Sequence, residues 1–199
     1  MSHSERVYNV VTAGVYVLAR GLFPFQAGPD RSGQVLGVVR LGGHREEGET
    51  GWECASREAW EEASMRVNPV APPATYWLDY GESDRLSPGP WEEDGIAPIL
   101  VSRKEDGSIT PIYLATSTDS PVPAAETKAL LLLRPEEIRR MVTTSITFRQ
   151  YLEAGGQAVS KAELPLDFIL QPFPHLRLLH VLLQMHPELA RLAPPAKQV

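Results

Sequence analysis

The sequence predicts an α+β fold: one domain that mixes strands and helices, followed by a helical segment near the C-terminus. Apolar, β-branched runs of strand length occur in three places, at Val10–Arg20, Gln34–Leu41 and Ala129–Leu133. Between them, Gly43–Met65 leads from a loop into a segment rich in Glu and Ala, and Phe173–Met185 carries leucines at helical spacing. A chain of 199 residues is long enough for one domain with a substantial core.

The composition is that of an ordinary globular protein, and it excludes some classes of function. No stretch approaches the roughly 20 apolar residues that a membrane-spanning helix needs. The net charge of −6 argues against a nucleic-acid partner, because phosphate backbones require a basic surface. Met1–Asn9 is too polar for a signal peptide, so a cytoplasmic protein is expected. The single Cys54 excludes an intrachain disulfide and a Cys-rich zinc site.

The first part of the chain is predicted to contain two strands joined by a long loop. Val10–Arg20 is expected to be buried on at least one face. Gly21–Gly33 is rich in Gly and Pro and is predicted to be the loop. Phe23 and Phe25 near its start either stack on a nucleobase or, as we favour, attach the loop to the core. Gln34–Leu41 is the second strand, and two glycines follow it directly.

Three carboxylates gather on one face of the helix predicted within Gly43–Met65. At about 100° of rotation per residue, Glu58, Glu61 and Glu62 fall within an arc of roughly 100°. Like charges that close raise one another's pKa and destabilise the helix unless a cation lies among them. A hard divalent ion such as Mg²⁺ prefers oxygen ligands and is a sufficient reason for the cluster. The alternative is a solvated acidic surface with Glu–Arg pairs.

Other residues of the same helix predict how it is held in place. Arg57 lies beside the acidic face, and Glu49 in the preceding loop is a candidate partner that would fix the loop to the helix. Cys54 is expected to be a small buried filler rather than a reactive thiolate. The neighbouring face would let the helix lie close against a sheet, because most of its residues are small: Trp52, Ala55, Ala59 and Ala63.

The spacing of these residues resembles the signature of the Nudix hydrolases, G-x5-E-x7-R-E-U-x-E-E-x-G-U, in which U is a bulky apolar residue. The matching positions are Gly43, Glu49, Arg57, Glu58, Glu61, Glu62 and Met65. The resemblance covers roughly residues 10–141 and implies the family's fold, an α/β/α sandwich with a mixed sheet between helices. Residues 1–145 are then expected to form the Nudix domain, and residues 146–199 an additional helical extension.

Two positions depart from the signature. Ala59 stands where a larger apolar residue is usual, and Ser64 stands where the family has Gly. The Gly helps to end the helix, because a left-handed backbone conformation is easy for Gly and costly for Ser. We therefore expect a differently shaped turn after the helix. The metal site should be retained, since every carboxylate of the signature is present.

The resemblance implies a metal-dependent pyrophosphohydrolase with Mg²⁺ or Mn²⁺ as its cofactor. The metal ligands that it implies are Glu58, Glu61, Glu62, the carbonyl of Gly42 and Glu126. Arg57 and Glu49 are expected to hold the loop and the geometry of the ligands. The general base is either Glu58 or an acidic residue of a later loop, for which the candidates are Glu92, Glu93 and Glu126.

The reaction implied is hydrolysis of a phosphoanhydride bond in a nucleoside diphosphate linked to another moiety. ADP-ribose, nucleotide sugars, dinucleoside polyphosphates and nucleoside triphosphates all remain open as small-molecule substrates. His44 either touches a phosphate or is a solvated loop residue. Tyr80 lies at about the distance from the signature where dinucleoside-polyphosphate hydrolases carry an aromatic residue. The candidate substrate contacts are His44, Tyr80, Trp91 and Glu93.

The segments after the signature are predicted to be short strands and a long loop. Arg66–Val70 and Thr75–Tyr80 are expected to be extended, and Tyr76 and Trp77 are either base-stacking groups or core. Gly81–Pro98 contains too many Gly and Pro residues for regular structure. With Trp91 and its acidic residues, this loop is either an active-site lid or, as we favour, a solvated acidic loop.

The remaining core elements are a hairpin and a helix. Ile99–Ser102 and Ile109–Ser117 are predicted to pair around Asp106-Gly107, a strong turn signal. Pro135–Met141 is predicted to be a helix with Pro at its first position.

The C-terminal extension is predicted to be mainly helical, at Thr147–Ala154 and Phe173–Met185. The second helix is apolar enough to cover the sheet or to form a homodimer interface. Three histidines near it lack acids at metal-binding spacing and are expected to be structural or surface residues: His175, His180 and His186. Leu192–Val199 is expected to be frayed.

Two rival functions follow from the same sequence. In the first, the domain is a non-catalytic module that senses a nucleotide and regulates a partner. The intact Glu58, Glu61 and Glu62 argue against it, since a sensor need not keep a costly carboxylate cluster. The second rival, an RNA-directed enzyme, is disfavoured by the net acidity of the chain.

Overall fold

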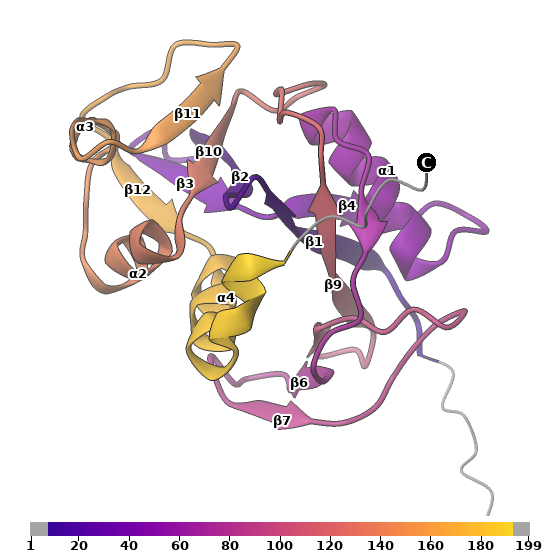
Figure 1. Cartoon of the computed structure of the whole chain (residues 1–199). Coiled ribbons are helices and arrows are strands. Elements are labelled where there is room, and N and C mark those ends of the chain that lie inside the picture. The colour runs from indigo at the N-terminus through magenta and orange to yellow at the C-terminus, as the bar shows by residue number, and fades with distance from the viewer. Residues whose placement is uncertain (1–7, 193–199) are drawn as a thin grey trace, which may run out of the picture.

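Two mixed sheets form the body of the protein, and helices cover both outer sides (Figure 1). The computed structural model describes residues 8–192. The first sheet contains β1 (Thr12–Ala19), β4 (Leu41–His44), β5 (Asn68–Pro69), β6 (Tyr76–Leu78), β7 (Leu86–Pro88), β8 (Leu100–Arg103) and β9 (Ile109–Ser117). The second sheet contains β2 (Phe23–Pro29), β3 (Val35–Val39), β10 (Ala129–Leu133), β11 (Gln157–Ser160) and β12 (Ile169–Pro172). The helices are α1 (Gly51–Ala63), α2 (Pro135–Thr143), α3 (Phe148–Glu153), α4 (Pro174–Met185) and the 3₁₀ helix η1 (Pro187–Arg191).

The first sheet has the order β4-β1-β9-β8-β6-β7, with β5 added on β9. Strands β1 and β9 run parallel, with Val15 opposite Tyr113, whereas β4 runs antiparallel to β1. Helix α1 packs on β1, β4 and β9 through three fully buried alanines and Cys54. The side that carries Trp52 and the alanines therefore faces this sheet, as the sequence predicted: Ala55, Ala59 and Ala63.

The second sheet has the order β11-β10-β2-β3-β12. Its two outer strands come from the C-terminal extension: β11 pairs antiparallel with β10, and β12 pairs parallel with β3. The extension thus supplies strands as well as helices. Helix α4 packs on β3, β12 and α2 and lies on the side of the molecule away from α1 (Figure 1). Its apolar stripe is buried within the chain: Leu176, Leu178, Leu179, Leu182 and Leu183.

The α+β class and the sandwich of mixed sheets between helices are confirmed by this arrangement. One expected strand is divided. Gln34–Leu41 was predicted as a single strand, but the chain leaves the second sheet after Val39 and enters the first at Leu41. Arg40 lies at this crossing point and is buried. Within residues 8–192, no helix is long and apolar enough to cross a membrane.

The prediction that Gly21–Gly33 is a loop is wrong, because it contains strand β2. Phe23 and Phe25 are almost fully buried and face the core, so they are strand residues rather than loop anchors. Pro24 is compatible with the strand because β2 pairs with β3 only from Gln26 onward, so Pro24 needs no amide for that partner. The prediction that Gly81–Pro98 lacks regular structure is wrong for three residues, since β7 pairs antiparallel with β6.

The open alternative for the two aromatic residues of β6 is resolved in favour of packing. Tyr76 is buried, and its hydroxyl lies 2.7 Å from Nε2 of His186. The indole N–H of Trp77 donates to the carbonyl of Gly89 at 3.0 Å. The region predicted to be frayed, Leu192–Val199, lies outside the described residues except for Leu192.

Helix α1 ends at Ser64 in a left-handed conformation, with φ 54° and ψ 36°. The amides of Ser64 and Met65 donate to the carbonyls of Trp60 and Ala59, at 2.9 and 3.2 Å. The expectation of a differently shaped turn is therefore wrong. Ser64 itself adopts the left-handed backbone that the signature assigns to Gly, because these two hydrogen bonds and the buried Met65 hold it there.

Replacing Ser64 by glycine is expected to raise the free energy of unfolding by about 0.5–1 kcal/mol, because Gly adopts φ 54° without steric cost. Urea unfolding followed by circular dichroism measures the change. Ser56→Gly, inside the same helix, is the matched control and should lower stability by about 0.5 kcal/mol. Destabilisation by Ser64→Gly as large as that of the control would contradict a strained turn.

Candidate metal and catalytic site

Helix α1 starts at a capping box that fixes the end of the preceding loop. The Thr50 hydroxyl accepts from the amide of Glu53 at 3.2 Å, and the Glu53 carboxylate accepts from the amide of Thr50 at 2.8 Å. Glu93, from the long loop after β7, accepts from the Gly51 amide at 2.6 Å. A carboxylate at a helix N-terminus is stabilised by the exposed amides and the helix dipole. Glu93 thus ties the acidic loop to the start of α1.

Arg57 connects the loop to the acidic face of α1, as the sequence predicted. Its guanidinium forms a bidentate pair with Glu49, with Nε and Nη2 at 2.7 and 3.1 Å from the two carboxylate oxygens. Nη1 lies 3.0 Å from a carboxylate oxygen of both Glu58 and Glu61. Nη2 also donates to the carbonyl of His44 at 3.0 Å. These hydrogen bonds hold the pKa of Glu49 below its ordinary value, with Arg57 as the main cause.

Glu62 faces inward, away from Arg57. Its Oε2 accepts from the amide of Gly42 at 2.8 Å. Burial raises the pKa of Glu62 to about 7, and the charge of Glu58 adds to this, while hydrogen bonds from Gly42 and Gln26 act in the opposite direction. The effect of burial on the pKa is larger than the effect of those hydrogen bonds. The negative charge of Glu62 is therefore not fully compensated by its protein neighbours.

The two glycines before the loop are required by close packing. A Cβ on Gly43 would lie 2.6 Å from the carboxyl carbon of Glu58, and one on Gly42 would lie 2.5 Å from the Cα of Gly14. Gly42 also has φ 139°, which is strained for other residues. The double glycine therefore lets β4 lie directly against β1 and α1.

Arg40 is a buried cation beside this site that sequence reasoning missed. It is 8% exposed, and its Nε has no hydrogen-bond partner among residues 8–192. Nη1 donates to the carbonyl of Leu41 at 3.3 Å. Burial lowers the pKa of Arg40, whereas the charge of Glu62 favours its protonated form. The sequence feature that could have indicated it is the position of Arg40, a charged residue near the end of the mainly apolar run Gln34–Leu41.

Gln26, on β2, is the second residue that was missed. Its Nε2 donates to the carbonyl of Arg40 at 3.2 Å, and its Oε1 accepts from the Thr127 hydroxyl at 2.8 Å. Gln26 also lowers the pKa of Glu62. Glu126 precedes Thr127 and lines the same cavity as Gln26. Strand β2 thereby brings Glu126 and the acidic helix to one region of the molecule.

The other residues singled out from the sequence lie in different surroundings. Tyr80 is 62% exposed, and its hydroxyl donates to Glu105 at 3.2 Å. Trp91 packs beside Trp77 on a small cluster of Val10, Val101 and Ile109. Cys54 is buried as expected, and burial raises the pKa of its thiol to about 11, so it is not a reactive thiolate.

The carboxylates fit a divalent cation in chemistry, although their present positions are set by Arg57. Among residues 8–192, no three acidic, His or Cys side chains stand close enough together to hold a metal ion. Two of the three carboxylates are turned toward Arg57, and Glu62 toward the Gly42 amide. The donor set is all oxygen, and it includes the half-buried carboxylate of Glu62, whose pKa burial raises. Such a set suits a hard ion such as Mg²⁺ or Mn²⁺.

A carboxylate-bearing helix, fixed by an arginine to its own lead-in loop, is the arrangement expected from the Nudix signature. Comparison with known families agrees: the NUDIX domain matches residues 10–149. Since the match spans well over half of the chain, the protein belongs to the NUDIX family. Hydrolases of this family act on small nucleotide substrates and generally use divalent metals.

Several solved structures resemble this chain. They include a NUDIX family hydrolase from Clostridium perfringens, with a TM-score of 0.47 and 21% identity, covering 67% of this chain and 86% of that one. An Ap4A hydrolase binary complex from C. elegans has a TM-score of 0.40 and 15% identity, covering 63% and 81%. An ADP-ribose pyrophosphatase from Streptococcus suis has a TM-score of 0.39 and 11% identity, covering 63% and 73%. A comparison with curated proteins finds no match.

Proposed function

We propose that this protein hydrolyses a phosphoanhydride bond in a nucleoside diphosphate linked to another moiety, with Mg²⁺ or Mn²⁺ as cofactor. The observation that carries the proposal is the arrangement of α1. Glu58 and Glu61 share one arginine nitrogen, and Glu62 lies half-buried against the Gly42 amide. Crowding carboxylates in this way lowers the stability of the fold, and a bound metal ion would be a sufficient reason to keep them there.

In this proposal Glu58, Glu61 and Glu62 hold the cation, with the Gly42 carbonyl and Glu126 as further ligands. A bound divalent ion lowers the pKa of a water ligand and offsets charge on phosphate oxygens. Arg57 and Glu49 act on the substrate only indirectly, because they fix the loop to α1 through the bidentate pair. The buried face of the first sheet packs against α1 and keeps the helix in place.

The general base is proposed to be Glu58 or Glu126. Glu58 lies in the cluster itself, and Glu126 lines the same cavity as Gln26, next to Thr127, whose hydroxyl donates to Gln26 at 2.8 Å. Glu93 is less suited to the role, because its carboxylate is held by the Gly51 amide at the start of the helix. Neither Tyr80 nor Trp91 packs on the motif, so neither supports a choice of substrate.

Product release from a substrate panel tests the proposal. The panel contains ADP-ribose, a nucleotide sugar, a dinucleoside polyphosphate and a nucleoside triphosphate, each with Mg²⁺, Mn²⁺ or EDTA. Cleavage of at least one class is expected, and it should be lost in EDTA and in Glu62→Gln. Nucleotide binding without any turnover would instead favour the non-catalytic sensing module, and turnover that survives EDTA would exclude the metal site.

A further inference from the structure

A cavity of about 300 Å³ lies over the second sheet. We call it the Gln26 cavity, after the residue at its inner end. The residues of its lining that matter here are Gln26, Gly28, Gly37, Glu126, Lys128 and Phe173. Its volume is at the lower end of the range of small-molecule sites, which begins at about 300 Å³. The segment that leads to its lining residue Glu126 is attached to the acidic helix, because the amide of Ala124 donates to the Glu62 carbonyl at 3.0 Å.

The inner end of the Gln26 cavity is connected to the candidate metal site through the chain between Arg40 and Gly42. The amide nitrogen of Gln26 donates to the Arg40 carbonyl at 3.2 Å, and the amide of Gly42, two residues further on, donates to Glu62 at 2.8 Å. Thr127 holds the amide oxygen of Gln26 at 2.8 Å, so the side chain is fixed at both ends. A substrate whose phosphates lie at Glu62 would therefore extend its remaining part past Gln26 into the cavity.

The floor of the cavity is bare backbone. Gly28 of β2 and Gly37 of β3 lie opposite each other in the antiparallel pair. A Cβ on Gly28 would meet only the Cδ of Lys128, at 4.0 Å, so the space above this glycine is open. The surface over Gly37 is covered by the ring of Phe173, so the open part of the floor lies over Gly28, beside that ring.

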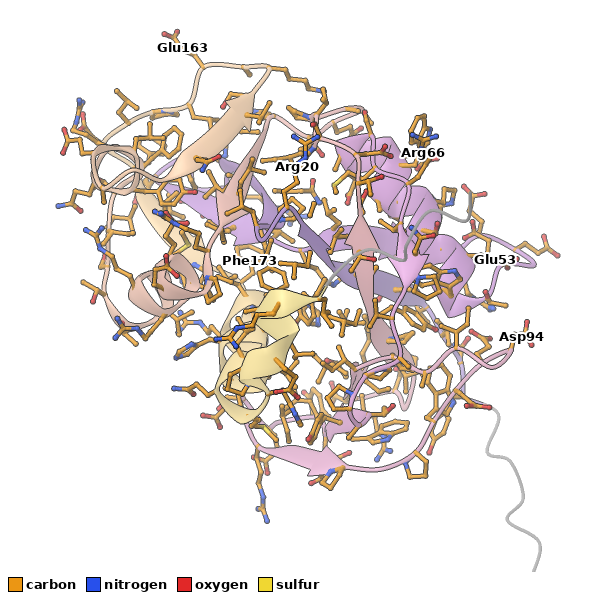
Figure 2. The ribbon with its side chains drawn as sticks, viewed as in Figure 1. Arg20, Glu53, Arg66, Asp94, Glu163 and Phe173 are labelled. Atoms are coloured by element: carbon orange, nitrogen blue, oxygen red, sulfur yellow. The ribbon has the colours of Figure 1, made fainter. Side chains whose placement is uncertain are left out.

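Phe173 supplies an aromatic wall, and it comes from the C-terminal extension, beyond the NUDIX match. The residue immediately precedes α4 (Figure 2). Its backbone is fixed, because its amide donates to the Val38 carbonyl at 3.1 Å and its carbonyl accepts from the Leu176 amide at 2.9 Å. Its ring lies over Gly37, with Cε1 3.0 Å from the position of a Cβ there.

The ring of Phe173 remains 41% exposed although the backbone around it is anchored. The aromatic residues of the second sheet, Phe23 and Phe25, are by contrast almost fully buried in the core. Core packing therefore does not account for Phe173. An aromatic face held beside an open floor and a polar group such as Lys128 suits a nucleobase, which stacks through its faces and hydrogen-bonds through its edge.

We propose that the Gln26 cavity binds the nucleobase end of the substrate and that Phe173 stacks on the base. This inference rests on the proposed function, since it assigns the base of the same nucleoside diphosphate derivative. The extension is then part of the substrate site as well as of the sheet. Residues 150–192 contribute specificity that the signature helix does not.

Steady-state hydrolysis by Phe173→Ala and Gly28→Val tests the inference. Loss of stacking is expected to raise KM about 10-fold or more and to change kcat little, because the base is remote from the bond that breaks. Gly28→Val has room for its Cβ and should fold, but its side chain would occupy the floor and raise KM as well. Phe173→Trp should restore a KM close to that of the unmodified protein.

Ile169→Ala is the matched control, since Ile169 is 40% exposed on β12 of the same extension and does not line the cavity. Its KM should stay unchanged. Hydrolysis with an unaltered KM in both Phe173→Ala and Gly28→Val would overturn the inference and leave the proposed function intact. If no substrate is cleaved, calorimetric titration with ADP replaces the kinetic assay. Weaker ADP binding by both variants than by the unmodified protein supports the inference. Equal binding by the variants, or no binding by the unmodified protein, overturns it.

Discussion

Glu62→Gln is expected to abolish turnover and, in metal-free protein above pH 7, to increase stability. Loss of a metal-binding carboxylate should lower kcat by about 10³-fold or more, since a bound cation supplies several kcal/mol of transition-state stabilisation. Glutamine can still accept the hydrogen bond from the Gly42 amide, which lies 2.8 Å from Oε2 of Glu62. The substitution therefore removes the charge and little else, so the fold should persist.

The gain in stability follows from the pKa of Glu62, which burial raises to about 7. Below the pKa of the unfolded chain, the carboxyl is protonated in both states and contributes no difference. As the pH rises toward 7, the unfolded chain releases its proton first, so stability falls, and above pH 7 the full penalty remains. Glutamine has no such penalty, so the variant should gain about 1–3 kcal/mol at pH 8 and much less at pH 5.

Urea unfolding in EDTA at the two pH values measures this difference. Glu53→Gln is the matched control, because Glu53 lies exposed on the same helix and its capping role is open to a glutamine oxygen. The control should keep both activity and pH dependence. Normal hydrolysis by Glu62→Gln would show that the metal-site assignment is wrong, and unchanged stability at pH 8 would show that Glu62 carries no buried charge.

A chain that ends at residue 149, where the NUDIX match ends, is expected not to fold. It lacks β11 and β12, which form the two outer strands of the second sheet, and it lacks α4. Burial of one leucine side chain contributes about 1.5–3 kcal/mol, and three leucines of α4 are fully buried: Leu176, Leu179 and Leu182. Their loss alone is comparable with a typical stability of about 5–15 kcal/mol.

Size-exclusion chromatography and thermal unfolding measure the outcome. Aggregation is expected, because truncation leaves β3 and β10 as open edges beside exposed core surface. A chain that ends at residue 192 is the control and should unfold cooperatively, since it keeps every contact described here. Cooperative unfolding of the shorter chain as a monomer would mean that the extension is an independent addition.

The sequence predicted the acidic helix well because its evidence is local. The spacing of Glu58, Glu61 and Glu62 follows from helix geometry, and the partner of Arg57 lies only one loop away. Strand β2 was missed because its Gly and Pro residues are typical of loops. This segment is a strand because it pairs with β10 on one side and β3 on the other, and those partners are distant in sequence or not recognisable from β2 itself.

The Gln26 cavity could not be predicted because its parts are distant in sequence. Phe173 meets Gly37 only through the parallel pairing of β12 with β3, and nothing in the local sequence specifies that pairing. Arg40 and Gln26 resemble ordinary polar positions of half-buried strands. Their burial depends on the crossing of the chain between two sheets, which is a property of the tertiary structure.

The position of Arg57 has a consequence for the order of events during biosynthesis. Its guanidinium pairs with two of the crowded carboxylates and with Glu49 of the loop, so the motif is held together by an internal cation. In a zinc finger, by contrast, the free energy of metal binding is also the free energy of folding. Here Arg57 allows the chain to complete its fold without metal. If the proposed metal dependence holds, metal supply is then expected to govern activity without governing abundance.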